Sequence, residues 1–483
     1  MARIQGVIEQ NYPPLVVDLD GTLLRSDLLM ETAMAFGRSR PLQFFRVFHW
    51  LYKGKAALKE GLALNTDIDV SVLPYDPNVI ELIEAQRATG RMVVLATAAH
   101  ESLAQRIAEH LNLFDLVLAS NSNRNLSAEH KRDLLIAHFG EGGFDYIGNA
   151  HDDLPVWKTA RHALAVNPER GVERQLRKLD NVAQVIDSNR ASWRDWRKAL
   201  RLHQWMKNIL VFVPLLASHR LSQPGLVLDG VLAFVFFGLC ASSVYILNDL
   251  LDLTDDRHHK SKCLRPFACG KLSIGTGLVA VPVLLAAAFG GALLTLPWQF
   301  SAVLGGYYLM TLAYSLQLKR KMALDVILLA MLYTTRIIAG VAAFNLQLTF
   351  WMLAFSMFIF LSLAMVKRYA ELRDARAREV MTLARGRGYY PGDLDMIASL
   401  GASSGYLSVM VLALYIQDTA TTALYREPHV IWLACPLLLF WITRVWMLTH
   451  RGQMNDDPVV FAIRDRISQA IGLAFTLVFW IAV

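Results

Sequence analysis

The stretch Pro14–Asp27, PLVVDLDGTLLRSD, decides the fold of the N-terminal part of the chain. Its short apolar run leads directly into Asp18, Asp20 and a Gly-Thr turn, which is typical of a buried strand with polar side chains at its carboxyl end. Side chains alternate along a strand, so the two carboxylates leave it on the same face. Because α/β sheets place their chemistry at the carboxyl ends of strands, the stretch predicts an α/β domain with a reactive edge.

Three later segments add polar residues that suit phosphate chemistry. They are Thr97 in RMVVLATAAH, Lys131 in NLSAEHKRDLL, and Asn149, Asp152 and Asp153 in FDYIGNAHDDLPVW. Together with DLDGT, this order resembles the four motifs of the haloacid dehalogenase (HAD) phosphohydrolase superfamily over about residues 13 to 170. The resemblance implies a HAD-like (Rossmannoid) domain within residues 1–188, with a helical cap at about 24–90.

The resemblance also implies a role for each motif. Asp18 would attack phosphorus and become an aspartyl phosphate, and Asp20 would protonate the leaving oxygen and later activate water. Thr97 and Lys131 would hold the phosphoryl oxygens, and Mg²⁺ would bind Asp18, Asp20 and Asp153. Asn149 stands where many relatives have Asp, which leaves Asp152 or Asp153 as the main ligand of that loop. A HAD fold that has lost catalysis and serves as a docking module is the alternative.

The predicted cap contains the segment PLQFFRVFHWLYKGKAALKEGLA, which has helical periodicity and many aromatic residues. Phe44, Phe45, Phe48, Trp50 and Leu51 either pack the core of the cap or contact a membrane or lipid-linked substrate.

The rest of the chain is too apolar for a soluble enzyme. Of 483 residues, 54% are hydrophobic and 18% are charged. Nine apolar segments follow the first domain: Ile209–Ala217, Leu226–Leu247, Gly275–Leu296, Phe300–Tyr314, Leu324–Phe344, Thr349–Met365, Ser403–Ile416, Val430–Leu448 and Ile467–Val483. Several approach the roughly 20 residues that cross a bilayer. They predict an all-α polytopic membrane domain over residues 204–483 with about nine transmembrane helices.

A linker, 189–203, joins the two predicted domains. The segment SWRDWRKALRLHQWMKN mixes tryptophans with basic residues, which indicates a helix at the lipid headgroups or, alternatively, a plain surface helix. The four Cys are scattered, so neither a disulfide framework nor a zinc ribbon is expected. The N-terminus has no signal-peptide pattern, which predicts that the first domain stays in the cytosol.

Positive charge separates the two sides of the predicted membrane domain. Lys and Arg gather in the loops that share a side with the N-terminus, whereas the opposite loops carry Arg220 and Arg426. The positive-inside rule then predicts a multi-pass protein of a bacterial-type plasma membrane with a cytoplasmic N-terminal domain. This distribution explains much of the net charge of +7, so we expect no nucleic-acid partner.

A second group of polar residues follows the second apolar segment, in YILNDLLDLTDDRHHKSKCLRPFACG. Asn248, Asp252 and Asp256 recur every four residues, which predicts that they lie along one side of a helix, each turned slightly from the one before. Asp249 adjoins them. So many carboxylates repel one another unless a cation lies among them. We expect the ligand to be a diphosphate bound through Mg²⁺, with Lys260 and Arg265 contacting its outer oxygens. A cluster without a ligand and a His/Cys metal site are the alternatives.

These residues resemble the UbiA prenyltransferase superfamily, whose NxxxDxxxD motif is followed by R-P-x-x-x-G, here Arg265, Pro266 and Gly270. Further segments resemble its phosphoribosyltransferase branch, which acts on decaprenyl phosphate: HQWMKN (Lys207, Asn208), AYSLQLKRKMALDV (Tyr314, Lys319, Asp325), RIIAG (Arg336), KRYAEL (Lys367, Arg368, Glu371) and DDPVVFAIRDR (Asp456, Asp457). The spacing places Asp325 and Arg336 on one helix face, where they could pair, and Lys367 and Glu371 could pair likewise.

The resemblance implies that phosphoribosyl pyrophosphate is the donor and that a polyprenyl phosphate in the membrane is the acceptor. Asp249, Asp252 and Asp256, with Asn248, would hold Mg²⁺, while Lys260, Arg265 and Lys319 would steady the donor's phosphates. Basic residues of the later segments, Lys207, Arg336, Lys367 and Arg368, would meet the acceptor's phosphate.

Fusion of the two domains indicates consecutive reactions. We expect the HAD domain to remove the 5-phosphate of the transferase product, which gives a polyprenyl-phosphoryl ribose for cell-surface arabinose transfer. A UbiA enzyme that prenylates an aromatic acceptor, with an inactive or regulatory HAD domain, is the alternative. The sequence does not determine whether the protein forms a homo-oligomer.

Overall fold

The computed structural model describes residues 12–121, 125–187, 191–377, 388–418, 425–454 and 457–483. Two compact units divide the chain: one comprises 1–200 and 245–281, the other 201–244 and 282–483. The predicted boundaries, 1–188, 189–203 and 204–483, stay a prediction.

Six parallel strands form the sheet of the first unit. The strands are β1 Leu15–Val17, β2 Val93–His100, β3 Leu116–Ser120, β4 Asp145–Gly148, β5 His162–Val166 and β6 Val182–Ile186. Their spatial order is β3-β2-β1-β4-β5-β6, so β1 lies at the point where the direction of winding reverses. Val17 pairs with Leu95 on one side and Ile147 on the other. This register brings the ends of β1 and β4, and the middle of the longer β2, to one edge.

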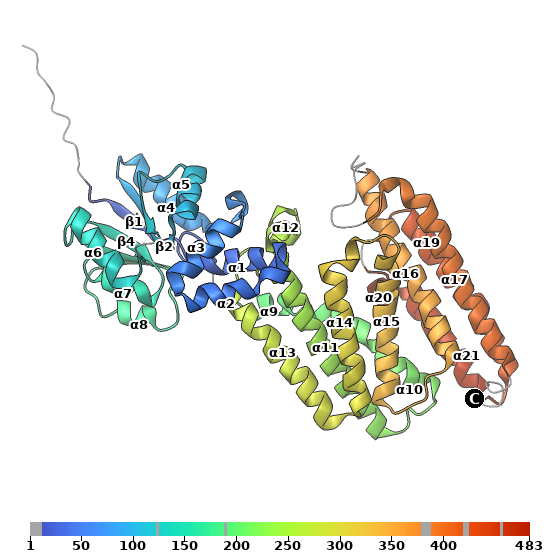
Figure 1. The fold of residues 1–483 in the computed structure, drawn as a ribbon. Coiled ribbons are helices and arrows are strands. Elements are labelled where there is room, and N and C mark those ends of the chain that lie inside the picture. The colour runs from blue at the N-terminus through green and yellow to red at the C-terminus, as the bar shows by residue number, and fades with distance from the viewer. Residues whose placement is uncertain (1–11, 122–124, 188–190, 378–387, 419–424, 455–456) are drawn as a thin grey trace, which may run out of the picture. The chain divides into compact units, whose positions relative to one another are not determined.

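Helices cover both faces of this sheet (Figure 1). On one face, α4 Pro77–Ala88 and α5 Glu101–Leu111 contribute Ile83 and Ile107 to a core with the strand residues. The opposite face is covered by α6 Ala128–Phe139, α7 Leu154–Trp157 and α8 Val172–Leu176. The predicted α/β domain is confirmed.

Three helices lie between β1 and α4, where the helical cap is expected. They are α1 Leu28–Ser39, α2 Phe45–Tyr52 and α3 Lys55–Asn65. Phe36, Leu58 and Leu62 form a small core of their own, with Trp50 packed against it. Further along the chain, α9 Trp193–Ala199 and a 3₁₀ segment, Leu202–Phe212, occupy the predicted linker region.

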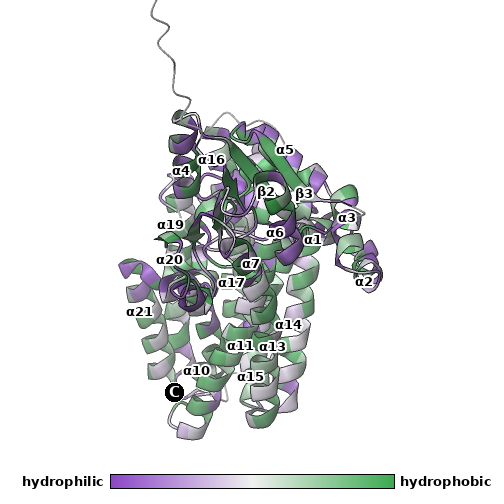
Figure 2. Ribbon diagram, turned by 90° about the vertical axis from the view of Figure 1, so that its left-hand side faces the viewer, coloured by the Kyte–Doolittle hydropathy of each residue, from purple (hydrophilic) through white to green (hydrophobic). Residues whose placement is uncertain are grey.

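Long apolar helices form most of the remaining chain, and Figure 2 shows hydrophobic residues along much of their length. In the described residues, six helical stretches are long and apolar enough to cross a membrane, or seven if the bent pair α20–α21 is one span. The helices concerned are α11 Pro224–Leu251, α13 Ile274–Thr295, α15 Leu324–Ala343, α16 Phe350–Ala377, α17 Leu394–Gln417, α19 Ala434–His450, α20 Pro458–Arg464 and α21 Arg466–Ala482. The chain is therefore a multi-pass membrane protein.

The predicted count of nine spans is not confirmed. The first predicted segment, Ile209–Ala217, forms part of the 3₁₀ segment and the short helix α10 Val213–Ala217. The fourth forms α14 Trp298–Leu316, which is outside the set of membrane-crossing candidates. Within the second unit, α15, α16, α17, α19 and α21 surround a core that includes Ile337, Phe360 and Val409.

Candidate active sites

The carboxyl end of β1 places Asp18 beside Lys131 of α6. Lys131 Nζ donates to Asp18 Oδ1 at 2.7 Å and to the hydroxyl of Tyr146 at 2.9 Å, and it lies 3.4 Å from Asp153 Oδ1. All four side chains are buried. The first unit thus brings together the predicted nucleophile and the predicted phosphate-binding lysine, from positions 113 residues apart.

Asp153 has a fuller set of partners than the sequence predicted. Its Oδ2 accepts from the backbone N–H groups of Asn149 and Ala150, while its Oδ1 accepts from Tyr146 and faces Lys131. A carboxylate with this many donors has little capacity left for a metal ion. Asp153 therefore holds Lys131 and the loop after β4 in place. Its binding of Mg²⁺ stays a prediction. Asp152 is exposed.

Burial raises the pKa of both strand-end carboxylates. The pKa of Asp18 rises to about 6 because burial outweighs the charge of Lys131, and Asp153 adds to the rise. Burial raises the pKa of Asp20 to about 7, with further contributions from the charges of Asp27 and Asp18. At neutral pH one carboxylate is largely ionised and the other holds a proton about half of the time. Such a pair suits a nucleophile with a general acid.

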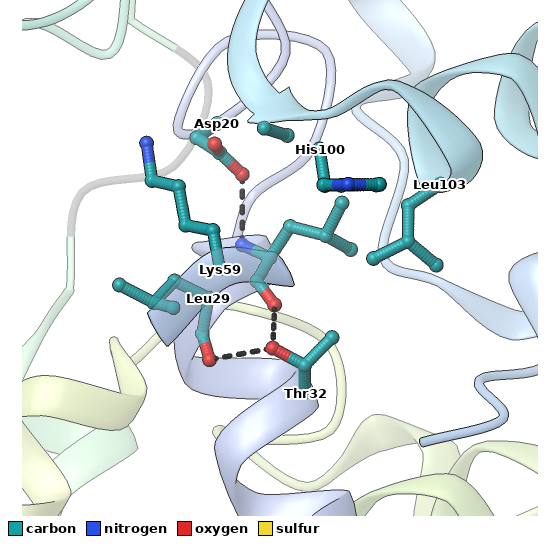
Figure 3. Close-up of a pocket in the computed structure, with 8 residues that line it drawn as sticks. Asp20, Leu29, Thr32, Lys59, His100 and Leu103 are labelled. Carbon is teal, nitrogen blue, oxygen red and sulfur yellow. Dashed lines mark hydrogen bonds between the residues drawn. The ribbon is translucent and has the colours of Figure 1, made fainter. Parts of the chain in front are cut away.

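A small pocket opens beside Asp20, between β2 and the cap (Figure 3). Asp20 Oδ1 accepts the backbone N–H of Leu28 at 2.7 Å, which orients this carboxylate at the start of α1. Lys59 of α3 and His100 at the end of β2 also line the pocket, and Lys59 Nζ donates to the carbonyl of Ala98 at 2.6 Å. Thr97 lies on the same strand, fully buried, where its Oγ1 accepts from the N–H of Ala99.

The loop after β4 lies directly against the DLDGT turn. Thr22 Oγ1 is 3.4 Å from Asn149 Oδ1, and a Cβ at Gly21, whose φ is +73°, would lie 2.2 Å from Asn149 Nδ2. Only glycine fits there. The Asn149 amide oxygen is thus near the nucleophile loop and is a suitable ligand type for Mg²⁺. Asn149 is therefore a candidate ligand of this loop beside the predicted Asp153.

The acidic segment of the first unit is not one continuous helix. Helix α11 ends at Leu251, Asp252 lies in the break, and α12 Leu253–His258 follows. Asp249 and Asp256 nevertheless converge, because Arg265 Nη1 lies 3.1 Å from the first and 2.6 Å from the second. Both carboxylates are buried, and burial raises the pKa of Asp256 although Arg265 opposes the rise. Arg265 therefore lies between these two acids, and the expected binding of Mg²⁺ by them stays a prediction.

Asp252 has a different partner from its two neighbours. Arg38, at the end of α1, lies 3.5 Å from Asp252 and also pairs with Asp255. Backbone hydrogen bonds still join Asp252 to Asn248 and Asp256 to Asp252, at 2.9 and 2.8 Å, so the predicted shared face of these residues stays a prediction. Lys260 is exposed, and Asn248 belongs to the last turn of α11.

Neither the HAD site nor the acidic segment has a complete set of protein ligands for a metal ion among the described residues. Across the described ranges, no three His, Cys, Asp or Glu side chains gather as a group that could hold a metal ion. The convergence of Asp249 and Asp256 still fits Mg²⁺, since this ion is usually held by one or two protein carboxylates and completed by phosphate oxygens.

In the second unit, two lysines converge on one carboxylate. Asp457, the N-cap of α20, accepts from Lys207 Nζ at 2.6 Å and lies 3.6 Å from Lys367 Nζ. The Tyr333 hydroxyl donates to the same carboxylate, and Lys207 lies 5.5 Å from the centre of its ring. Burial alone would raise the pKa of Asp457, but the two lysines bring it far below its usual range.

Arg336 lies near this group in an aromatic setting. It is 4% exposed, and its guanidinium lies 5.2 Å from the ring centres of both Phe237 and Tyr307. Arg336 Nε donates to Asn208 Oδ1 at 3.2 Å, while the buried Nδ2 of Asn208 has no hydrogen-bond partner among the described residues. A buried amide donor without a partner is a position where a ligand's acceptor gains a hydrogen bond.

The remaining predicted residues form another buried group. Asp325 Oδ2 lies 2.5 Å from Arg368 Nε, with both side chains at most 1% exposed, and Asp325 Oδ1 accepts from the Tyr314 hydroxyl. Glu371 also pairs with Arg368. Pairing of Asp325 with Arg336 and of Lys367 with Glu371 was the alternative, and the ion pairs found here join Asp325 and Glu371 to Arg368, and Lys367 to Asp457. The partners come from neighbouring helices or from the i,i+3 position instead. Lys319 lies half-buried in the short 3₁₀ segment Leu318–Arg320.

Several residues of these groups escaped sequence reasoning. Tyr146 and Tyr333 look like ordinary apolar members of a strand and a helix, and Lys59 looks like a surface lysine of the cap. Asp457 is within a quoted segment, but nothing in the spacing indicates its lysine partners. Asp456 lies outside the described residues.

Comparison with known proteins adds the family. The model of the UbiA prenyltransferase family matches residues 209–475, and that of haloacid dehalogenase-like hydrolases matches residues 15–156. Protein y4nM of Sinorhizobium fredii is 37% identical to this chain over 97% of the chain and 91% of its own length. The decaprenyl-phosphate phosphoribosyltransferase of Mycobacterium tuberculosis is 30% identical, with 59% of this chain and 91% of that protein covered.

Among solved structures, a UbiA homolog from Archaeoglobus fulgidus bound to GPP and Mg²⁺ has a TM-score of 0.45 and 15% sequence identity. The match covers 60% of this chain and all of the other. The UbiA model alone covers more than half of the chain. The chain therefore belongs to the UbiA prenyltransferase family and carries a haloacid dehalogenase-like domain at its N-terminus.

Proposed function

We propose that this enzyme transfers 5-phosphoribosyl from phosphoribosyl pyrophosphate to a polyprenyl phosphate, and that its HAD domain then removes the 5-phosphate. The similarity to a decaprenyl-phosphate phosphoribosyltransferase supports the first step. The observation that carries the proposal is the buried group around Asp457.

Among the described residues, Lys207 and Lys367 both lie against the Asp457 carboxylate, and Arg336 is buried nearby against aromatic rings. A buried excess of positive charge is costly unless an anion accompanies it. A lipid phosphate supplies such an anion, whereas a neutral aromatic acceptor does not. The unpartnered amide of Asn208 gives the same anion a further hydrogen-bond donor.

We assign the donor's pyrophosphate to the acidic segment. Asp249 and Asp256 would hold Mg²⁺ against the diphosphate oxygens, and Arg265 would move from the carboxylates to the phosphates. Bound there, Mg²⁺ would neutralise charge on the departing pyrophosphate.

The transfer itself needs little from the protein besides position and charge. The bond between ribose C1 and the pyrophosphate oxygen breaks, and pyrophosphate leaves with the electron pair. A bond between C1 and the lipid phosphate oxygen forms. The acceptor is already ionised at neutral pH, so no general base is required.

In the HAD domain, Asp18 would attack the phosphorus of the 5-phosphate, while Asp20 gives its proton to the ribose oxygen that leaves. Asp20 would then take a proton from water, which attacks the aspartyl phosphate, releases inorganic phosphate and restores Asp18. Lys131 would offset phosphoryl charge, and Lys59 and His100, which line the pocket beside Asp20, would contact the leaving group. Asp18, Asp20 and the Asn149 amide would hold Mg²⁺, which supplies further charge neutralisation.

This order of reactions places both active sites on the cytoplasmic side of a bacterial-type inner membrane, where phosphoribosyl pyrophosphate is available. The product, a polyprenyl-phosphoryl ribose, would serve cell-envelope glycosylation with a pentose such as arabinose.

The transferase is tested with membranes that contain the protein, polyprenyl phosphate, Mg²⁺ and phosphoribosyl pyrophosphate labelled in the ribose. We expect label in an organic-soluble lipid with the wild type and more than a hundredfold less with Asp256→Asn. Asp255→Asn is the matched control, because this neighbouring acid is largely exposed and should leave labelling intact. Labelled lipid that is equal in both variants, or prenylation of an aromatic acceptor in place of ribosyl transfer, would refute the proposal.

The phosphatase is tested on the same lipids by mass spectrometry. Asp18→Asn should leave lipid labelling intact and trap the product with its 5-phosphate, whereas the exposed Asp152→Asn should still give the dephosphorylated lipid. Dephosphorylated product from the Asp18 variant would show that the HAD domain does not perform this step.

A further inference from the structure

The cap exposes an aromatic surface to its surroundings. Its members are Leu42, Phe44, Phe45, Phe48, Leu51 and Tyr52, which we call the cap patch. Their exposed fractions run from 38% for Phe44 to 91% for Tyr52. Isolated exposed apolar side chains are ordinary, but a contiguous group of this size on one short segment indicates a surface with a partner.

Helix α2 lies at an outer edge of the cap, beside α3 (Figure 2). Its inner side contributes Trp50, whose ring lies 5.4 Å from that of Phe36 and packs against Gly61. Its outer side presents Phe45, Phe48 and Tyr52. The inner side of α2 therefore packs into the core of the cap, whereas the aromatic side chains on its outer side do not.

The charged residues next to the cap patch are basic. Residues 32–59 contain no Asp or Glu; Arg40, Arg46, Lys53 and Lys55 flank the patch, whereas Arg38 pairs with Asp252 and Asp255 and Lys59 lines the pocket beside Asp20. Arg46 and Lys53 adjoin the cap patch directly in sequence. Aromatic side chains flanked by lysine and arginine are typical of segments that lie in the headgroup region of anionic bilayers.

Contacts inside the first unit also connect the cap to a membrane helix. Arg257 of α12 donates to both oxygens of Glu31 on α1, at 2.6 and 3.0 Å, and both side chains are 5% exposed. Helix α12 begins two residues after α11, a membrane-crossing candidate, ends. Since α1 leads into α2 through a short turn, the cap patch belongs to a part of the chain that is bound to the end of a span.

We propose that the cap patch is a membrane-binding surface, in which the outer aromatics of α2 enter the headgroup region of an anionic bilayer and the neighbouring basic residues contact lipid phosphates. The surface holds the cap at the bilayer independently of which reaction either domain catalyses.

The test uses full-length protein in lipid vesicles. Single cysteines at Phe45 and Phe48 are introduced after Cys240, Cys263, Cys269 and Cys435 are replaced, and each is labelled with the environment-sensitive dye NBD. Val185→Cys, at an exposed position of β6, is the matched control. In vesicles with phosphatidylglycerol we expect blue-shifted emission at 45 and 48, and at least twofold quenching by lipids spin-labelled near the headgroup. The control label should show neither effect.

Two results would overturn the proposal. Labels at 45 and 48 that emit as in water show an unoccupied surface. Blue-shifted labels that spin-labelled lipid does not quench show that protein covers the patch. In that case, the protein-to-lipid ratio shows which molecule covers the patch. If quenching by lipid appears at a low ratio, a second copy of the protein covers it; if quenching is absent at every ratio, another part of the same chain covers it.

A charge variant tests the anionic part of the proposal separately. Arg46→Gln combined with Lys53→Gln and Lys55→Gln should reduce the difference in quenching between anionic and zwitterionic vesicles at least threefold. A difference that remains unchanged would refute the role of the basic residues. Because these positions lie on the surface, the variant should fold as the wild type does.

Discussion

Replacement of Lys131 by Met tests how the HAD site keeps its nucleophile ionised. Lys131 Nζ lies 2.7 Å from Asp18, so at an effective dielectric constant of about 20 their attraction is about 6 kcal/mol, or about four pKa units. Asp18, with a pKa of about 6, is about 90% ionised at pH 7. Without the lysine its pKa should rise by two to four units. The ionised fraction at pH 7 should then fall by about one to three orders of magnitude.

The assay is a pH–rate profile of phosphoester hydrolysis at a fixed concentration of Mg²⁺. In the wild type, the rate should increase with pH as Asp18 loses its proton near pH 6 and decrease as Asp20 loses its own near pH 7. In Lys131→Met the acid limb should shift to higher pH while the maximal rate falls. Lys158→Met, at an exposed lysine of the same domain, is the control. A variant with reduced rate but an unshifted acid limb would refute the electrostatic role, and unchanged ribosyl transfer by the variant would show that it is folded.

Three further predictions follow from other contacts. Asn149→Asp adds a carboxylate at this candidate metal ligand and should lower the Mg²⁺ concentration for half-maximal phosphatase activity about tenfold, an order of magnitude that corresponds to about 1.4 kcal/mol. An unchanged titration would contradict that role. Asp457→Asn removes the carboxylate that the buried Lys207 and the half-buried Lys367 contact, which should cost about 3–5 kcal/mol in stability of the membrane domain and should reduce ribosyl transfer in membranes more than tenfold while phosphatase activity persists. Normal transfer and thermal stability would refute it. Asp145 binds Arg91 and Arg161, and these arginines lower its pKa although burial opposes them. Its stabilisation is therefore present above pH about 4 and lost as the pH falls through its lowered value. Asp145→Asn should lower the thermal midpoint at pH 7 but less at pH 3, and the exposed Asp133→Asn should change neither.

The sequence could predict which strand-end residues of the HAD domain converge, because their positions follow from parallel strands. Asp18 and Asn149 follow neighbouring strands directly, so their convergence depends only on strand order. The side chains that surround these strand-end residues could not be predicted from strand order. Tyr146, for example, faces Lys131 because of the pleat of β4, and nothing distinguishes it in sequence from a core tyrosine.

The membrane helices show where local spacing fails. An i,i+4 pattern does not reveal the interruption at Asp252, nor that Arg38 lies near Asp252 while Arg265 lies near Asp249 and Asp256. Likewise, Asp325 pairs with Arg368 from the next helix rather than with Arg336 on its own. Which helices face each other is decided by packing between elements, and sequence periodicity contains no information about that choice.

Arg265 bridges Asp249 and Asp256, so the protein itself supplies a positive charge between these two buried acids. If Mg²⁺ binds here as proposed, we expect a chelator to stop transfer without unfolding the protein, unlike proteins whose metal is part of their stability. Donor binding then becomes an exchange of partners, in which one arginine leaves two carboxylates as a charged ligand arrives. In such an exchange, Arg265 keeps an anionic partner before and after the donor binds.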